Sequence, residues 1–198
     1  MKNRKATIKR KTKETDINLT WNLDGKGTNK INTGIPFFDH MLQLFSAHGL
    51  FDLDLKVKGD IEVDFHHTVE DVGICMGQAY REAIDNAKGI TRFASCIIPM
   101  DETLCQIAID VSGRPYFEWN RDSVESKNGV FNGELAEAFF SAFVDNARIT
   151  LHIDLLRGKN LHHMLEACFK AFGICLDQAT MFDDRKKGAI PSTKGILL

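Results

Sequence analysis

The sequence contains the motif His-His-x-x-Glu twice. His66-His67-Thr68-Val69-Glu70 recurs as His162-His163-Met164-Leu165-Glu166, which begins at position 162 against position 66, an offset of 96 residues. A repeat of metal-binding residue types at a fixed offset is typical of internal duplication. We therefore expect the chain to fold as two similar halves, each of which presents one copy of the motif.

The segments around the two copies also correspond in kind. Each motif opens an apolar stretch that predicts a helix, over residues 66–87 and 161–181, and each follows a helical pattern and then an alternation typical of half-buried strands. The helices that precede the motifs are indicated by the apolar residues Phe38, Met41, Leu42 and Phe45 in the first half and Leu135, Ala138, Phe139 and Ala142 in the second. The strands are indicated by Ile17, Leu19, Trp21, Leu23, Phe51, Leu53, Leu55, Val57, Ile107, Ile109, Val111, Ile149, Leu151, Ile153 and Leu155. After a turn at Gly59-Asp60, the residues Ile61, Val63 and Phe65 predict one more strand.

These patterns predict an α+β fold of two similar β/α halves, with antiparallel or mixed sheets and helices packed on one face. We expect the first half to span residues 1–90, the second to span 91–183, and residues 184–198 to form an exposed tail. The segment 2–13 is rich in lysine and arginine. We interpret it as a solvated strand with Thr7 and Ile8 facing inward, rather than as an arm for nucleic acid.

Composition excludes several classes of protein. The chain has 25 Lys and Arg against 27 Asp and Glu, a net charge of −2, which gives no field that would attract nucleic acid. No run approaches the roughly 18 apolar residues of a membrane span, and the N-terminus lacks the apolar core of a signal peptide. The five cysteines form no metal-binding spacing, and we expect them to be reduced core residues of a cytoplasmic protein.

The doubled motif is suited to binding metal ions. Successive helical residues point about 100° apart, so His66 and His67 are expected to serve different ions. Glu70 can join either ion, because residues three and four positions apart share a flank of the helix. Imidazole and carboxylate ligands without thiolate suit Mn, Fe, Co, Ni or Zn. The two copies therefore predict a two-metal site whose metal the motif leaves open.

Cations and hydroxyls elsewhere in the chain are typical of a phosphate site. Arg92 and Arg114 occupy corresponding loop positions, and Ser192-Thr193-Lys194-Gly195 supplies hydroxyls, an ammonium and flexible backbone. Together with two metals they predict a small phosphorylated substrate. Three functions fit this inventory: a metal-dependent lyase, a two-metal phosphatase or other hydrolase, and an assembly in which the metal clusters only join subunits.

Longer motifs resemble one enzyme family. They are Gly34-Ile-Pro-Phe-Phe-Asp-His-Met-Leu42, Ala47-His48-Gly49, His66-His67-Thr-Val-Glu70-Asp71, Ser112-Gly-Arg-Pro-Tyr116, Leu151-His152, His162-His163-Met-Leu-Glu166 and Ile190-Pro-Ser-Thr-Lys-Gly195. In this order, from about Ala6 to Leu197, they resemble imidazoleglycerol-phosphate dehydratase of histidine biosynthesis. The resemblance implies two similar βα halves, like those of a small-subunit ribosomal protein domain, and trimers that assemble into a homo-oligomer of twenty-four subunits. It also implies two Mn(II) ions per active site, bound between neighbouring subunits.

The resemblance also implies roles for individual residues. The implied metal ligands are His40, His66, His67, Glu70, His162, His163 and Glu166. The implied substrate-binding residues are Glu14, His40, His48, Arg92, Arg114, Lys170, Ser192, Thr193 and Lys194, and the implied catalytic residues are Glu166, Glu70 and His48.

The implied reaction removes water from imidazole glycerol phosphate to give imidazole acetol phosphate. Once the hydroxyl has left, a carboxylate must take a proton from carbon, and we assign this step to Glu166, with Glu70 as the alternative. One departure from the family concerns Ala138, where many relatives have a histidine that would be the repeat counterpart of His40. One metal would then lose a protein ligand, which water or Glu137 could replace.

Overall fold

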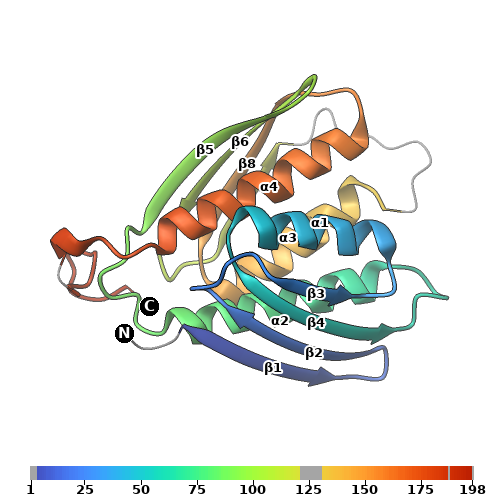
Figure 1. Ribbon diagram of the computed structural model, residues 1–198, viewed down its shortest axis with the longest axis horizontal. Helices are drawn as coiled ribbons and strands as arrows, with labels where there is room; N and C mark the ends of the chain where they lie inside the picture. The colour runs from blue at the N-terminus through green and yellow to red at the C-terminus, as the bar shows by residue number, and fades with distance from the viewer. Residues whose placement is uncertain (1–3, 121–130, 187, 198) are drawn as a thin grey trace.

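In the computed structural model, which describes residues 4–120, 131–186 and 188–197, four helices lie between two sheets (Figure 1). The predicted halves and tail include residues 1–3, 121–130, Lys187 and Leu198, which lie outside the described residues, as does Lys2 of the basic segment. Both sheets are four-stranded in the described part of the chain. The helices cover the inner face of each sheet, which confirms the predicted α+β fold of two similar halves.

The first sheet has the strand order β1-β2-β4-β3, in which β3 pairs parallel to β4 and the other pairs are antiparallel. Its elements are β1 (Lys5–Lys11), β2 (Thr15–Asn22), β3 (Asn29–Asn32), α1 (Pro36–His48), β4 (Asp52–Gly59) and α2 (His66–Ile84). Apart from Thr15, the inward residues of β2 and β4 are apolar and nearly inaccessible, whereas their outward neighbours are polar or charged. This alternation buries one face of the sheet beneath α1 and α2.

The second sheet repeats this plan in the order β5-β6-β8-β7, again with one parallel pair, β7 with β8. Its elements are β5 (Phe93–Met100), β6 (Thr103–Asp110), β7 (Tyr116–Asn120), α3 (Gly133–Ala147), β8 (Thr150–Arg157) and α4 (Leu161–Thr180), followed by the short 3-10 helix η1 (Asp184–Lys186). The sheets are therefore mixed, one of the two arrangements that the alternation predicted.

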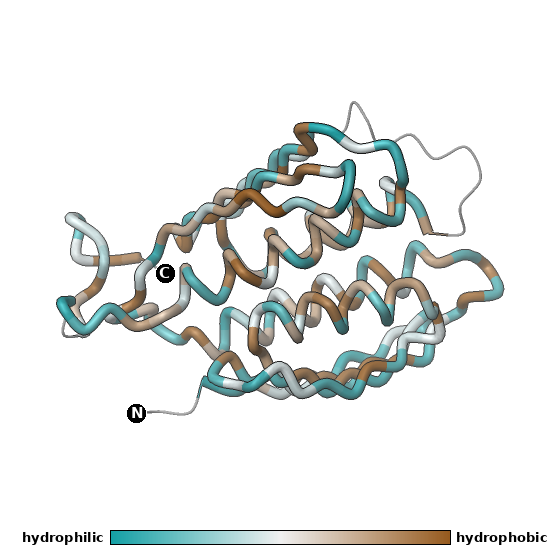
Figure 2. The backbone as a smooth tube through the Cα atoms, turned by 45° about the horizontal axis from the view of Figure 1, so that its top comes forward, coloured by the Kyte–Doolittle hydropathy of each residue, from teal (hydrophilic) through white to brown (hydrophobic). Residues whose placement is uncertain are grey.

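Close helix contacts join the two halves, with α1 packed on α4 and α2 packed on α3. Glycine makes these contacts possible: a Cβ on Gly77 would lie 2.5 Å from the carbonyl oxygen of Phe143, and one on Gly173 would lie 2.5 Å from that of Phe45. Hydrophobic residues recur along all four helices (Figure 2), and aromatic rings such as Trp21 pack edge-on against Phe45 in this layer. The halves thus share one core and hold their helices at fixed positions.

Two local predictions are wrong. No strand forms at Ile61, Val63 and Phe65, because β4 ends at Gly59 and a turn follows in which the Asp64 carboxylate accepts the N–H of His66, at the start of α2. Thr7 is exposed, since Ala6 and Ile8 take the inward positions of β1 and adjacent residues of a strand face opposite ways.

The helix ends also differ slightly from their prediction, because α2 ends at Ile84 and α4 at Thr180. All five cysteines are free thiols, as expected; four are buried and Cys96 is half-buried. In the part of the chain that the structure describes, none of the helices combines the length and the apolar character that crossing a membrane requires.

Candidate metal and phosphate sites

A three-residue cluster forms where α1 crosses α4. Glu166 Oε2 lies 3.1 Å from His162 Nε2, one helical turn away, and 3.6 Å from Nε2 of His40 on α1. The possible ligand atoms of these residues all lie within 4.8 Å of one another, and theirs is the one group of this kind among the described residues. Asn160 begins α4 by accepting the N–H of His162 at 2.9 Å. The helix start and the α1–α4 crossing therefore create a compact imidazole and carboxylate cluster.

The carboxylate of this cluster is buried and ionised. Only 7% of Glu166 is exposed, and its second oxygen lies 2.5 Å from Lys170 Nζ. Burial raises the pKa of Glu166, but the ammonium of Lys170 and then the imidazole of His162 lower it, and the net pKa is below the usual value. At the end of α1, burial and then the charge of Lys170 lower the pKa of His48. His48 and Lys170 thus belong to the electrostatic surroundings of Glu166.

The second histidine of each motif is held by a carboxylate. His163 Nδ1 lies 2.8 Å from Glu102 Oε2, and His67 Nδ1 lies 3.0 Å from Asp60 Oδ2. These bonds raise the pKa of both histidines, and the bond to His163 is the first cause that lowers the pKa of Glu102 to about 2. Sequence reasoning missed Asp60 and Glu102. The duplication could have indicated Glu102, which precedes the first residue of β6 as Glu14 precedes that of β2.

The first copy of the motif is more open. His66 Nε2 lies 4.0 Å from Glu70 Oε2, and both side chains are about half exposed. Nε2 of His67 lies 3.9 Å from Glu14 Oε1. These residues do not join the His40 cluster, and Ala138 offers no ligand atom from α3. The described chain therefore presents one complete cluster and one looser set.

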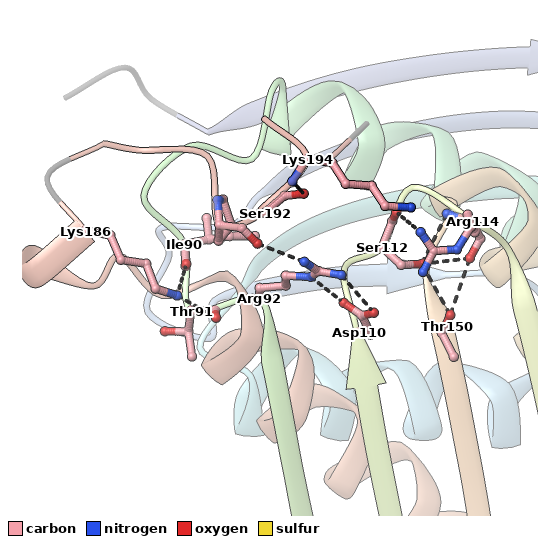
Figure 3. Close-up of polar contacts among 11 residues, drawn as sticks. Ile90, Thr91, Arg92, Asp110, Ser112, Arg114, Thr150, Lys186, Ser192 and Lys194 are labelled. Atoms are coloured by element: carbon pink, nitrogen blue, oxygen red, sulfur yellow. Dashed lines mark hydrogen bonds and ion pairs between the residues drawn. The ribbon is translucent and has the colours of Figure 1, made fainter. Parts of the chain in front are cut away.

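The predicted phosphate residues gather at a different place. Arg92 donates to both oxygens of Asp110, at 2.7 and 3.2 Å, and to the carbonyl of Pro191 at 2.8 Å, which ties the tail to the start of β5 (Figure 3). Arg92 has a φ of +80°, a left-handed conformation that is strained for a residue other than glycine. Beside it, Arg114 donates to the carbonyl of Ser112 at 3.5 Å, and the Lys194 side chain points towards this pair (Figure 3).

The tail around these residues is open. Ser192 is half-buried, and its hydroxyl accepts the N–H of Lys194 at 3.2 Å, whereas Thr193 and Lys194 are exposed. Lys186 is engaged elsewhere, because its Nζ donates to the carbonyls of Ile90 and Thr91. The ammonium of Lys194 and the guanidinium of Arg114 have no salt-bridge partner among the described residues. They are thus available to an anionic ligand.

The two groups lie at opposite ends of α4. The N–H of Arg92 donates to the carbonyl of Ala179 in the last turn, whereas Glu166 lies near the first turn. A rise of 1.5 Å per residue separates these levels by about 20 Å. Figure 1 shows the same separation, with the red tail at one end of α4 and the start of that helix at the other. Within one chain, the cluster of His40, His162 and Glu166 therefore lies apart from the predicted phosphate residues around Arg92.

Known proteins similar to this chain agree on one family. The family described as imidazoleglycerol-phosphate dehydratase matches residues 33–176. A protein of that name from Pelobacter propionicus is 53% identical over 98% of this chain and 99% of its own length. One from Acetivibrio thermocellus is 55% identical over the same shares of the two chains.

Solved structures agree as well. The imidazoleglycerol-phosphate dehydratase of Staphylococcus aureus superimposes with a TM-score of 0.81 at 41% identity, over 90% of this chain and 99% of that chain. That of Pyrococcus furiosus superimposes with a TM-score of 0.82 at 34% identity, over 96% and 100%. The chain belongs to the imidazoleglycerol-phosphate dehydratase family, the hydro-lyases of histidine biosynthesis.

Proposed function

We propose that this chain catalyses the metal-dependent dehydration of D-erythro-imidazole glycerol phosphate to imidazole acetol phosphate and water, with two Mn(II) ions per active site. The observation that carries the metal dependence is the cluster of His40, His162 and Glu166, whose possible ligand atoms lie within 4.8 Å of one another. Family membership supports the reaction itself.

The residues present fit a divalent ion of this kind. Two imidazoles and one carboxylate within 4.8 Å match the mixed nitrogen and oxygen ligands that Mn(II) accepts. His66 or His67 with Glu70 would hold the second ion, and His163 would complete the ligand set. When bound, the cations would favour the deprotonated imidazole of the substrate, whose electrons can help expel the neighbouring hydroxyl.

Glu166 is our proposed general base. Its lowered pKa keeps the carboxylate ionised, so it can accept the proton that leaves the substrate carbon. Lys170 holds the other oxygen at 2.5 Å, which restricts the rotation of the carboxylate. Glu70 is the alternative base, and it is the more exposed of the two.

The active site is proposed to combine residues of different subunits. A five-membered ring, three carbons and a phosphate extend no more than about 10 Å at ordinary bond lengths. The cluster around Glu166 and the residues around Arg92 lie about 20 Å apart along α4. A substrate that contacts both sets must therefore take them from two chains. This separation supports a site shared between chains. The homo-oligomer of twenty-four subunits, built from trimers, is proposed from the resemblance alone.

In this arrangement, the phosphate would contact Arg92, Arg114, Ser192, Thr193 and Lys194 of one chain. Their hydroxyls and cations suit a dianion and would fix the distance from the phosphate to the reacting carbons. Glu14 and His48 would line the site beside the imidazole. We further propose a cytoplasmic location, which the free thiols support, and no nucleic-acid partner.

The test is the dehydration assay on protein stripped of metal by a chelator. We expect no imidazole acetol phosphate without metal and full recovery when Mn(II) is added, because the proposed role of the cluster is to hold the ions that polarise the substrate imidazole. Activity that persists in the stripped protein would refute metal dependence. Release of inorganic phosphate in place of the ketone product would indicate a hydrolase.

A further inference from the structure

The hydrogen bonds between Glu102 and His163 and between Asp60 and His67 are the same interaction built twice. In both, a carboxylate oxygen lies about 3 Å from Nδ1 of the second histidine of the motif, at 2.8 and 3.0 Å. A carboxylate can only accept at Nδ1, so the neutral ring carries its proton there and keeps the lone pair on Nε2. In their neutral form, both histidines thus direct the lone pair of Nε2 away from their carboxylate partner.

The two carboxylates come from different places in the two halves. Glu102 lies in the turn between β5 and β6, immediately before the first residue of β6. The corresponding residue of the first half is Glu14, immediately before the first residue of β2. Asp60 directly follows β4, and the residue at the corresponding position of the second half, directly after β8, is Gly158. Inheritance from a common repeat therefore does not explain why both histidines have such a partner. A requirement shared by the two histidines does.

Glu102 is itself fixed in position. Its Oε1 accepts the N–H of Asn160 at 2.9 Å and that of Lys159 at 3.2 Å, in the loop that leads into α4. One oxygen of Glu102 thus bonds to the His163 ring, and the other bonds to the backbone of the loop that leads into α4. Asp60 is held through its backbone, whose N–H donates to the carbonyl of Glu14 at 3.0 Å.

We propose that Glu102 and Asp60 are positioning residues that fix the tautomer and ring orientation of His163 and His67, so that each Nε2 is presented to a metal ion. The inference rests on the proposed metal dependence and adds to it two residues outside the doubled motif. Removing such a partner from a metal-binding histidine typically weakens metal affinity by about 10–100-fold.

The test measures Mn(II) binding by the assembled, metal-stripped protein, from the electron paramagnetic resonance signal of the free ion. We expect Glu102→Ala and Asp60→Ala each to weaken one class of Mn(II) sites by about 10–100-fold. Glu118→Ala is the matched control, because Glu118 is an exposed carboxylate on β7 that bonds only to Tyr116 in the described chain. It should bind Mn(II) like the wild type.

A second readout separates orientation from loop structure. In Cu(II)-loaded protein, electron spin echo modulation reports the imidazole nitrogen remote from the metal, and its signal depends on the hydrogen bond at that atom. Glu102→Ala should change this signal. Glu102→Gln, whose amide oxygen can still accept from Nδ1, should bind Mn(II) more tightly than Glu102→Ala. If Glu102→Ala does not fold, Asp60→Ala carries the test.

The positioning role would be overturned if Glu102→Ala and Asp60→Ala both bound Mn(II) with wild-type affinity and Glu102→Ala left the remote-nitrogen signal unchanged. The proposed function would remain intact. A wild-type protein that binds no divalent ion would instead refute the proposed function, and the positioning role with it.

Discussion

Two inactive variants that carry their defects at opposite ends of α4 should restore activity to one another. Arg114→Ala removes one of the proposed phosphate-binding cations beside the C-terminal end of α4. Glu166→Gln removes the proposed base near the N-terminal end of that helix. The two ends lie about 20 Å apart along the helix, which is farther than the substrate reaches. In the proposed oligomer, each active site would therefore take its Glu166 and its Arg114 from different chains.

The expected magnitude follows from random assembly. In an equal mixture of the two variants, half of the sites receive a native Glu166 and, independently, half receive a native Arg114. About one quarter of the sites then contain both, so the mixed oligomer should regain about 25% of wild-type turnover. The double variant Arg114→Ala/Glu166→Gln, mixed equally with wild type, should also give about one quarter, whereas a site within one chain would give about one half.

The assay uses variants that carry different affinity tags, are expressed together and are purified through both tags in sequence. Each variant alone must be nearly inactive, and the mixed sample must have the same mass as the wild-type assembly. Turnover of the mixed oligomer no higher than that of the single variants would refute the shared site and place each substrate against one chain.

Two further predictions concern the base and the helix crossing. Glu166→Gln should lose most turnover but still bind substrate, because the amide cannot accept a proton from carbon; near-normal turnover, measured with a substrate-binding titration in parallel, would exclude Glu166 as the base. Gly77→Ala should destabilise the fold by about 1–3 kcal/mol, since its Cβ would lie 2.5 Å from the Phe143 carbonyl oxygen and 2.7 Å from Asn146 Cβ. Denaturant unfolding measures this loss, with exposed Glu82→Ala as the near-neutral control, and equal stability of both variants would contradict the packing argument.

The alternation of apolar residues was enough to predict the strands that pack one face on helices. The alternation is clear around Leu53, Leu55 and Leu151 because their outward neighbours are polar. β5 escaped the same reasoning, because exposed Phe93 and Ile97 make its outer face as apolar as its inner one. Short β3 lies parallel to β4 and offers too few residues to show a period.

The candidate site was predictable where it repeats. The spacing of the motif places His162 and Glu166 one turn apart, which the structure bears out at 3.1 Å. That His40 joins them depends on how α1 crosses α4, which no local pattern records. Asp60 and Glu102 were missed because their bonds to histidine arise from turns at the ends of strands.

The most direct test of the account is a crystal structure of the protein with Mn(II), in which anomalous scattering locates the ions. We predict one ion bound by His40, His162 and Glu166, a second bound by a histidine of the first motif with Glu70, and Arg114 of a neighbouring subunit facing the space between them. Ions absent from both motifs, or an Arg114 that faces the metals of its own chain, would contradict it.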